Sequence, residues 1–280
     1  MLRTSNPVLR DDTFAGQRWG GIMNDLDKHE SGSSSPAMPG VMSIRGTAIK
    51  TGFLVLLCAA CAVVMYTLIR NGTIGRTLPF WGGMIGSIGL GFVIAFWKQG
   101  APFLAPVYAV VKGVFLGVLT LMIADQIPVP KGLGANEAAA FAAKNTAMIF
   151  NAVGLTFGIA IALAGAYAFG LIRIGSTMMK VVTVATVGVG LLYLAQFVMS
   201  MMGVPFLMQI HQGGTIGIVF SLFVIALASF NLVMTFQFAE DGVKSGAPKY
   251  MEWYMGFAIL VELAWLYIEI LRLLAKLRRD

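Results

Sequence analysis

Long apolar runs, separated by short polar breaks, recur along the chain from about residue 51 onward. Each run is close to the about 20 residues that a helix needs to cross a hydrocarbon core of about 30 Å. Because backbone groups in lipid must be hydrogen-bonded within one segment, these runs predict helices rather than strands. The sequence therefore predicts an all-α, polytopic membrane bundle of seven transmembrane helices. The expected spans cover residues 51–69, 78–97, 103–123, 146–170, 181–202, 215–238 and 253–274.

The first 50 residues differ from the rest because they are mostly polar and rich in Ser, Pro and Gly in their second half. Such a segment buries too little apolar surface to offset the entropy lost on ordering. We therefore expect a mobile polar N-terminal tail, residues 1–50, followed by a transmembrane domain, residues 51–280. A longer link is expected at residues 125–145, where an alanine-rich stretch is compatible with a short helix.

Composition sharpens this interpretation. Hydrophobic residues make up 58% of the chain and charged residues 12%, and the mean hydropathy is +0.80. These values exclude a soluble enzyme, a nucleic-acid-binding protein and a secreted disulfide scaffold. We interpret the net charge of +7 as Lys and Arg at helix ends, not as a sign of a polyanionic partner. Eleven Lys and Arg fall on the side of the tail and eight on the other, which favours a cytoplasmic N-terminus.

Small and potentially reactive residues point to packing rather than to catalysis. Cys58 and Cys61 lie within an apolar run, so we interpret them as packing residues and not as a redox or metal site. His29 and His211 lie outside the spans, which leaves no histidine pair for a metal and no base for a serine. We therefore expect no enzymatic activity, metal or cofactor. Glycines four residues apart predict close helix packing at three places: Gly82 and Gly86, Gly113 and Gly117, and Gly154 and Gly158.

Three ionisable residues fall well inside the predicted spans: Lys112, Glu262 and Glu269. Charges at such depth are costly and commonly mark an ion pathway, a proton relay or a buried pair. Lys112 and Glu262 each lie about nine residues into odd-numbered spans, or about 13 Å deep. Since odd-numbered spans run in the same direction, an ion pair between these two is geometrically feasible. Glu269 precedes Arg272 by three residues, so these two side chains can pair on one helix.

The sixth predicted span ends with the polar residues Asn231, Thr235 and Gln237. Asn231 and Thr235 are four residues apart and share a helix face. Because this span runs antiparallel to the seventh, Asn231 is expected near the level of Glu262. Two interpretations stay open: a polar site between the last two helices, or hydrogen bonds that only hold neighbouring helices together.

Five segments carry a resemblance to one family. They are residues 5–9 (SNPVL), 105–109 (APVYA), 113–117 (GVFLG), 246–254 (GAPKYMEWY) and 265–274 (WLYIEILRLL). Together they resemble the bacterial branch of the Bax inhibitor-1/YccA family (the TMBIM superfamily). The resemblance implies a seven-helix fold in which the last helix is central and two three-helix layers surround it. It also implies a pH-sensitive calcium leak channel, in which two aspartates on the last two helices share a proton.

This sequence departs from the family pattern at the aspartate pair. Aligned on the end of the last helix, one aspartate falls on Glu262, whereas the other falls on Thr235 or, in an alternative placement, on Gln237. The third-span glycine motif is usually preceded by Glu in the family and is preceded here by Lys112. Two close carboxylates are what allows such a pair to titrate near neutral pH. We therefore expect a fixed bridge between Glu262 and Lys112, and weak or altered pH gating.

Two functional hypotheses follow from the resemblance. The first is a cation leak channel, with calcium as the expected ion and Glu262 as its central polar group. The second is a non-conducting regulator of a membrane partner, such as a membrane-bound protease, that acts through the N-terminal tail. A proton-coupled transporter ranks last, because the two halves of the chain show no convincing repeat of broken helices. The expected location is the bacterial cytoplasmic (inner) membrane.

Overall fold

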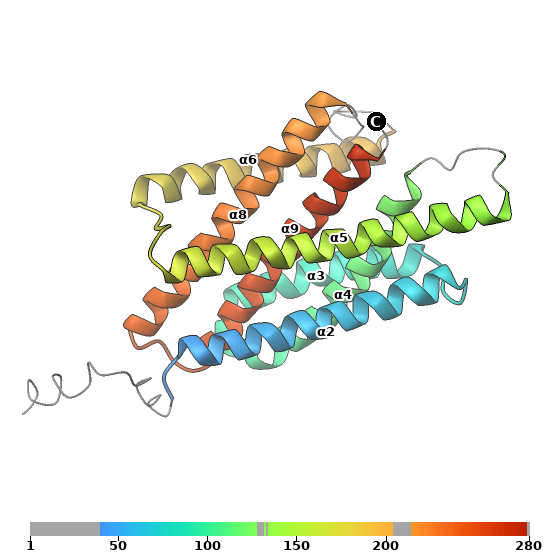
Figure 1. The fold of residues 1–280 in the computed structure, drawn as a ribbon. Coiled ribbons are helices and arrows are strands. Elements are labelled where there is room, and N and C mark those ends of the chain that lie inside the picture. The colour runs from blue at the N-terminus through green and yellow to red at the C-terminus, as the bar shows by residue number, and fades with distance from the viewer. Residues whose placement is uncertain (1–39, 128–131, 133, 204–213, 279–280) are drawn as a thin grey trace, which may run out of the picture. The chain divides into compact units, whose positions relative to one another are not determined.

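The structure is a computed structural model and describes residues 40–127, 132, 134–203 and 214–278 (Figure 1). Within these ranges the chain forms seven α-helices and one 3-10 turn. The helices are α2 (Ile44–Arg70), α3 (Thr77–Phe96), α4 (Ala101–Asp125), α5 (Ala135–Ala168), α6 (Ser176–Met201), α8 (Thr215–Lys244) and α9 (Met251–Leu277), and the turn η1 is Lys98–Gly100. The predicted all-α bundle is confirmed for the described part of the chain.

Six helical segments are long and apolar enough to cross a membrane: they lie in α2, α3, η1 with α4, α5, α6 and α8. The seventh predicted span corresponds to α9, which is not among these six. α9 carries five charged residues and is the helix that the others surround. The described part of the chain is thus a helical membrane bundle, and its last helix differs in character from the rest.

The helix boundaries differ from the prediction by several residues, most of all at the starts of α2 and α5. α2 begins at Ile44, not at residue 51, because the Ser43 side chain accepts a hydrogen bond from the Gly46 amide and caps the helix. The expected tail therefore includes the first two turns of a helix, while residues 1–39 lie outside the described ranges. The expected link at residues 125–145 was also wrong in part, since α5 starts at Ala135 and continues through the alanine-rich stretch.

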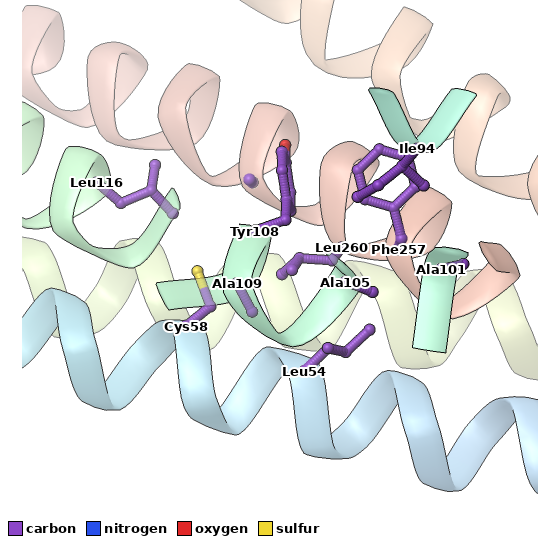
Figure 2. Packing of buried hydrophobic residues seen from close by; sticks show 11 residues of the cluster. Leu54, Cys58, Ile94, Ala101, Ala105, Tyr108, Ala109, Leu116, Phe257 and Leu260 are labelled. Carbon is purple, nitrogen blue, oxygen red and sulfur yellow. The ribbon is translucent and has the colours of Figure 1, made fainter. Parts of the chain in front are cut away.

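α9 lies at the centre of the described bundle and contacts α2, α4, α5 and α8 (Figure 1). On one side of it, α2 and α3 pack against α4; on the other, α5 and α6 pack against α8. This arrangement confirms the expectation of a central last helix between two three-helix layers. Figure 2 shows the first of these contacts, where Leu54, Cys58, Ala105, Tyr108 and Leu260 pack together from α2, α4 and α9.

Close packing of α4 on α2 depends on two glycines. A Cβ at Gly113 would clash with the Cys58 carbonyl oxygen, and one at Gly117 would lie 2.5 Å from the Ala62 carbonyl oxygen. This confirms the expected glycine contact and the packing role of Cys58. The prediction was wrong for Gly154 and Gly158, because an added Cβ at either position meets nothing within 4 Å.

Gly40 to Met42 pair with the connection between α8 and α9. The Met42 amide donates to the Ala247 carbonyl (2.8 Å), and the Lys249 amide donates to the Gly40 carbonyl (3.0 Å). Val41 and Pro248 form an isolated antiparallel bridge between these bonds. Met42 is 3% exposed and packs against Ala239 and Met255. The segment that precedes α2 is therefore attached to the start of α9.

Candidate functional site: the charged groups of the central helix

The central helix α9 carries five charged side chains, and the site is built from them: Glu252, Glu262, Glu269, Arg272 and Lys276. A charge inside a helical bundle is stable only where hydrogen bonds or an opposite charge compensate its lost hydration. Four of the five have such partners among the described residues. The fifth, Glu262, has a carboxylate oxygen that none of the described residues compensates.

Glu252 lies in the first turn of α9 and joins it to α2. Its Oε1 accepts hydrogen bonds from the amide and the hydroxyl of Ser43, both at 2.9 Å, and its Oε2 forms an ion pair with Lys50. The side chain is 2% exposed. Gly46 leaves the room for this carboxylate, because a Cβ there would clash with it. Sequence reasoning missed this cluster, although Glu252 belongs to one of the family-like segments.

Glu269 connects α9 to α6. Its Oε1 accepts hydrogen bonds from the Tyr193 hydroxyl (2.8 Å) and from the Arg272 guanidinium (2.9 Å). The Arg272 guanidinium also lies over the Tyr193 ring, 5.2 Å from its centroid. The predicted pairing of Glu269 with Arg272 is therefore confirmed, and Tyr193 adds a contact between helices. We interpret this cluster as structural, because all three side chains are used to hold α6 against α9.

Lys276 connects the other end of α9 to α8. Its Nζ donates to the Gly217 carbonyl and to the Ser221 hydroxyl, both at 2.8 Å, and the residue is 4% exposed. The sequence placed Lys276 among the basic residues of a helix end. The structure shows instead a buried cation held by α8, so a contribution of Lys276 to membrane orientation is not expected.

Glu262 lies near the middle of α9, and its Oε2 is buried without a hydrogen-bond partner among the residues that the structure describes. The expected bridge to Lys112 was wrong, since no ion pair joins the two among the described salt bridges. Lys112 instead places its Nζ 5.4 Å from the ring centroid of Phe115, three residues along α4. Residues three apart lie on the same helix face, so the lysine packs along its own helix.

The polar residues of α8 make hydrogen bonds away from Glu262. Asn231 Nδ2 donates to the Thr186 hydroxyl of α6 (2.7 Å), and the Thr235 hydroxyl donates to the Asn231 carbonyl (3.1 Å). Gln237 accepts a hydrogen bond from the Ile174 amide (3.3 Å) in the connection between α5 and α6. Of the two interpretations left open, these contacts favour hydrogen bonds that hold neighbouring helices together.

A cavity of about 420 Å³ lies between α2, α4, α5 and α9. Its lining is largely apolar and includes Leu263 and Ala264, the two residues that follow Glu262. Its polar part includes a hydrogen bond between the hydroxyls of Thr120 and Tyr267 (2.9 Å). Across the described residues, no group of three His, Cys, Asp or Glu side chains is placed to hold a metal ion.

All five charged residues of the site lie within the part of the chain that matches one known protein family. Residues 6–279 match the family model described as Bax inhibitor 1 like. No curated protein and no solved structure matches the chain significantly.

Proposed function

Since this helical membrane protein belongs to the Bax inhibitor 1-like family, we propose that it is a cation leak channel with weakened or altered pH gating. Calcium is the expected ion, and Glu262 is the acid on which the leak depends. The observation that carries this proposal is the buried Glu262 Oε2, which has no hydrogen-bond partner in the part of the chain that the structure describes. An uncompensated carboxylate oxygen at membrane depth is costly, and such residues commonly mark ion or proton pathways.

The altered gating rests on the residues of α8. A carboxylate pair responds sharply to pH because two like charges at short range cannot both ionise freely. Thr235 and Gln237 carry no charge, and both already make hydrogen bonds to other backbone groups. Because Lys112 lies over the ring of Phe115 on its own helix, Glu262 has neither a second acid nor a bridging base as partner within the described ranges. We therefore propose that conduction depends on Glu262 but lacks a shared-proton switch.

Calcium flux in proteoliposomes tests this proposal at about pH 6 and about pH 8, the range over which a shared-proton pair titrates. We expect the wild type to leak at both values, with a shallower pH response than a shared-proton pair would give, and Glu262→Gln to leak less at both. Glu240→Gln is the matched control, because it removes one carboxylate at the end of α8, where Glu240 contacts Tyr167 and Lys244. A strong pH-dependent leak that Glu262→Gln abolishes would refute the altered gating, and no leak from the wild type would refute the channel.

A second candidate function is a non-conducting regulator of a membrane partner, such as a membrane-bound protease, that acts through residues 1–39. The pairing of Gly40 and Met42 with Lys249 and Ala247 favours it, because this pairing holds the first described residues of the chain at the start of α9. Deleting residues 1–39 distinguishes the two functions. A regulator would lose its effect on the partner, whereas a channel would keep its calcium flux.

Both candidate functions are non-enzymatic and require no cofactor. We propose the bacterial cytoplasmic membrane as the location, with the N-terminus on the cytoplasmic side. Eleven Lys and Arg on that side, against seven on the other once the buried Lys276 is left out, support this orientation. Labelling of Lys249→Cys and of Arg76→Cys, each in a chain whose Cys58 and Cys61 are replaced by alanine, with an impermeant maleimide on intact cells, tests it. Cytoplasmic Lys249 should resist labelling and Arg76 should react.

A further inference from the structure

A second cavity, of about 300 Å³, lies where the first turns of the α5 span meet the last turns of α9. Its lining combines two cations with apolar side chains. They are Lys144 and Arg278, and Met148, Leu274 and Leu277. α5 and α9, the two helices that line it, are in contact in the described bundle. The cavity is separate from Glu262 and from the cavity that Thr120 and Tyr267 line.

The two cations of this cavity have no acidic partner among the described residues. The four ion pairs found among the described residues involve neither Lys144 nor Arg278. Arg278 donates one hydrogen bond to Asn145 Oδ1 (2.6 Å), and its guanidinium lies 5.8 Å from the centroid of the Phe141 ring. A guanidinium has five N–H donors in a fork, so this contact orients the group and leaves donors for an anion. Lys144 is exposed and adds a second positive charge.

The position of the cavity along the helices matches the level of lipid phosphates. The apolar span of α5 begins at Ala140, four residues before Lys144, and α9 ends at Leu277, just before Arg278. Basic residues at the ends of membrane helices lie at the interface, next to the headgroups. Basic pockets between membrane helices at the cytoplasmic face bind anionic headgroups; the orientation proposed above puts this cavity at the opposite face, where the same pairing of Arg and Lys with a phosphate applies. The positive charge of the cavity and its position at the membrane interface therefore both favour a lipid phosphate as its occupant.

The apolar part of the lining distinguishes a lipid from a free anion. Met148 belongs to the core cluster between α5 and α9, and Leu274 packs against that cluster. Both residues also line the cavity, so an occupant would contact them on one side and the cations on the other. Inorganic phosphate would gain nothing from the apolar side. A phospholipid would place its phosphate at the cations and its glycerol and first methylenes over the apolar residues.

We propose that this cavity binds the phosphate headgroup of an anionic membrane phospholipid, with Arg278 and Lys144 as its phosphate ligands. Arg278 is the oriented ligand, because Asn145 and Phe141 fix its guanidinium. Lys144 is the mobile ligand that adds charge. The site requires no ion conduction, so it stands or falls independently of the proposed channel.

Titration of the detergent-purified protein with dioleoyl phosphatidylglycerol, followed by native mass spectrometry, tests the site. We expect Lys144→Gln to weaken the apparent Kd about fivefold and the double variant Lys144→Gln/Arg278→Gln about thirtyfold. The matched control is Arg70→Gln/Arg76→Gln, which removes two positive charges from the same end of the bundle, outside the cavity. This control should bind phosphatidylglycerol like the wild type.

Two comparison ligands complete the experiment. Dioleoyl phosphatidylcholine should bind much more weakly than phosphatidylglycerol, and inorganic phosphate should not displace the lipid. Equal binding of the two lipids, displacement by phosphate, or equal loss in the control variant would each overturn the proposal. Lys144→Gln guards against misfolding, because Lys144 forms no ion pair with the described residues that the substitution could break. An unchanged Kd for a folded Lys144→Gln protein would remove Lys144 from the site and overturn the proposal as stated.

Discussion

Gly117 lies where α4 touches the backbone of α2, and Gly117→Ala tests whether this contact sets the distance between the two helices. An added Cβ would lie 2.5 Å from the Ala62 carbonyl oxygen and 3.0 Å from the Met65 Cβ. Ordinary van der Waals contacts of a Cβ begin at about 3.4 Å, so α2 must move away by nearly 1 Å. The obstacle is backbone, which cannot rotate aside as a long side chain could.

The expected cost follows from two opposing contributions. Overpacking a well-packed interior costs about 1–3 kcal/mol, and a backbone obstacle favours the upper end of that range. Replacing Gly by Ala inside a helix returns up to about 1 kcal/mol through helix propensity. Gly158→Ala in α5 is the matched control, because its Cβ would meet nothing within 4 Å. Since propensity acts on both variants, the difference between them isolates the steric contribution, about 2–3 kcal/mol.

The free energy of unfolding can be measured in mixed micelles by SDS titration, with helix content followed by circular dichroism. We expect Gly117→Ala to unfold at a lower SDS fraction than the wild type, and Gly158→Ala at the same or a higher one. A difference below about 0.5 kcal/mol between the two variants, the size of an ordinary surface substitution, would refute this reasoning. It would mean that α4 and α2 are held apart by something other than Gly117.

Three further predictions concern polar contacts of α8 and α9, and a fourth, on the pair of Arg76 with Asp125 between α3 and α4, is the exposed comparison for the first. Glu252→Gln should lower the free energy of unfolding in the SDS titration by about 2 kcal/mol. This is less than the about 3–5 kcal/mol of a fully buried ion pair, because Lys50 is partly exposed. Arg76→Gln breaks a half-exposed pair and should cost at most about 1 kcal/mol in the same titration. Tyr193→Phe removes a hydrogen bond to a carboxylate and should cost about 1.5–3 kcal/mol by thermal unfolding, and no loss would contradict its role as a link to α9. Asn231→Ala should cost about 0.6–1.7 kcal/mol yet leave calcium flux unchanged, and a changed flux in the folded variant would return this residue to the ion pathway.

The number and type of the helices could be predicted because the signal lies in runs of about 20 apolar residues. The pairing of Glu269 with Arg272 could be predicted too, since residues three apart on one helix are always neighbours. The boundaries were less accurate at Ile44 and Ala135, where local capping and an alanine-rich stretch extend the helices into polar sequence. Local rules therefore gave the elements and the local pairs.

Contacts between helices were harder to predict, because the sequence shows how deep a residue lies in its span but not toward which neighbouring helix it points. Counting residues along two spans gives the depth of Lys112 and Glu262, but not their angles around the two helix axes. The two lie at similar expected depths and still do not pair. Glu252 and Lys50 are separated by 202 positions, so only the packing of α9 against α2 brings them together. The central position of α9 came from the family resemblance, not from any periodicity.

The backbone pairing of Gly40 and Met42 with Lys249 and Ala247 also has a mechanical consequence. A force applied to the chain ahead of Gly40 reaches this pairing before it reaches α2. The load would then pass to the connection between α8 and α9, and from there to the innermost helix. A machine that extracted the protein from the membrane by its N-terminal end would thus pull first on the centre of the bundle. Once α9 yielded, the two layers that it separates would lose their shared support together.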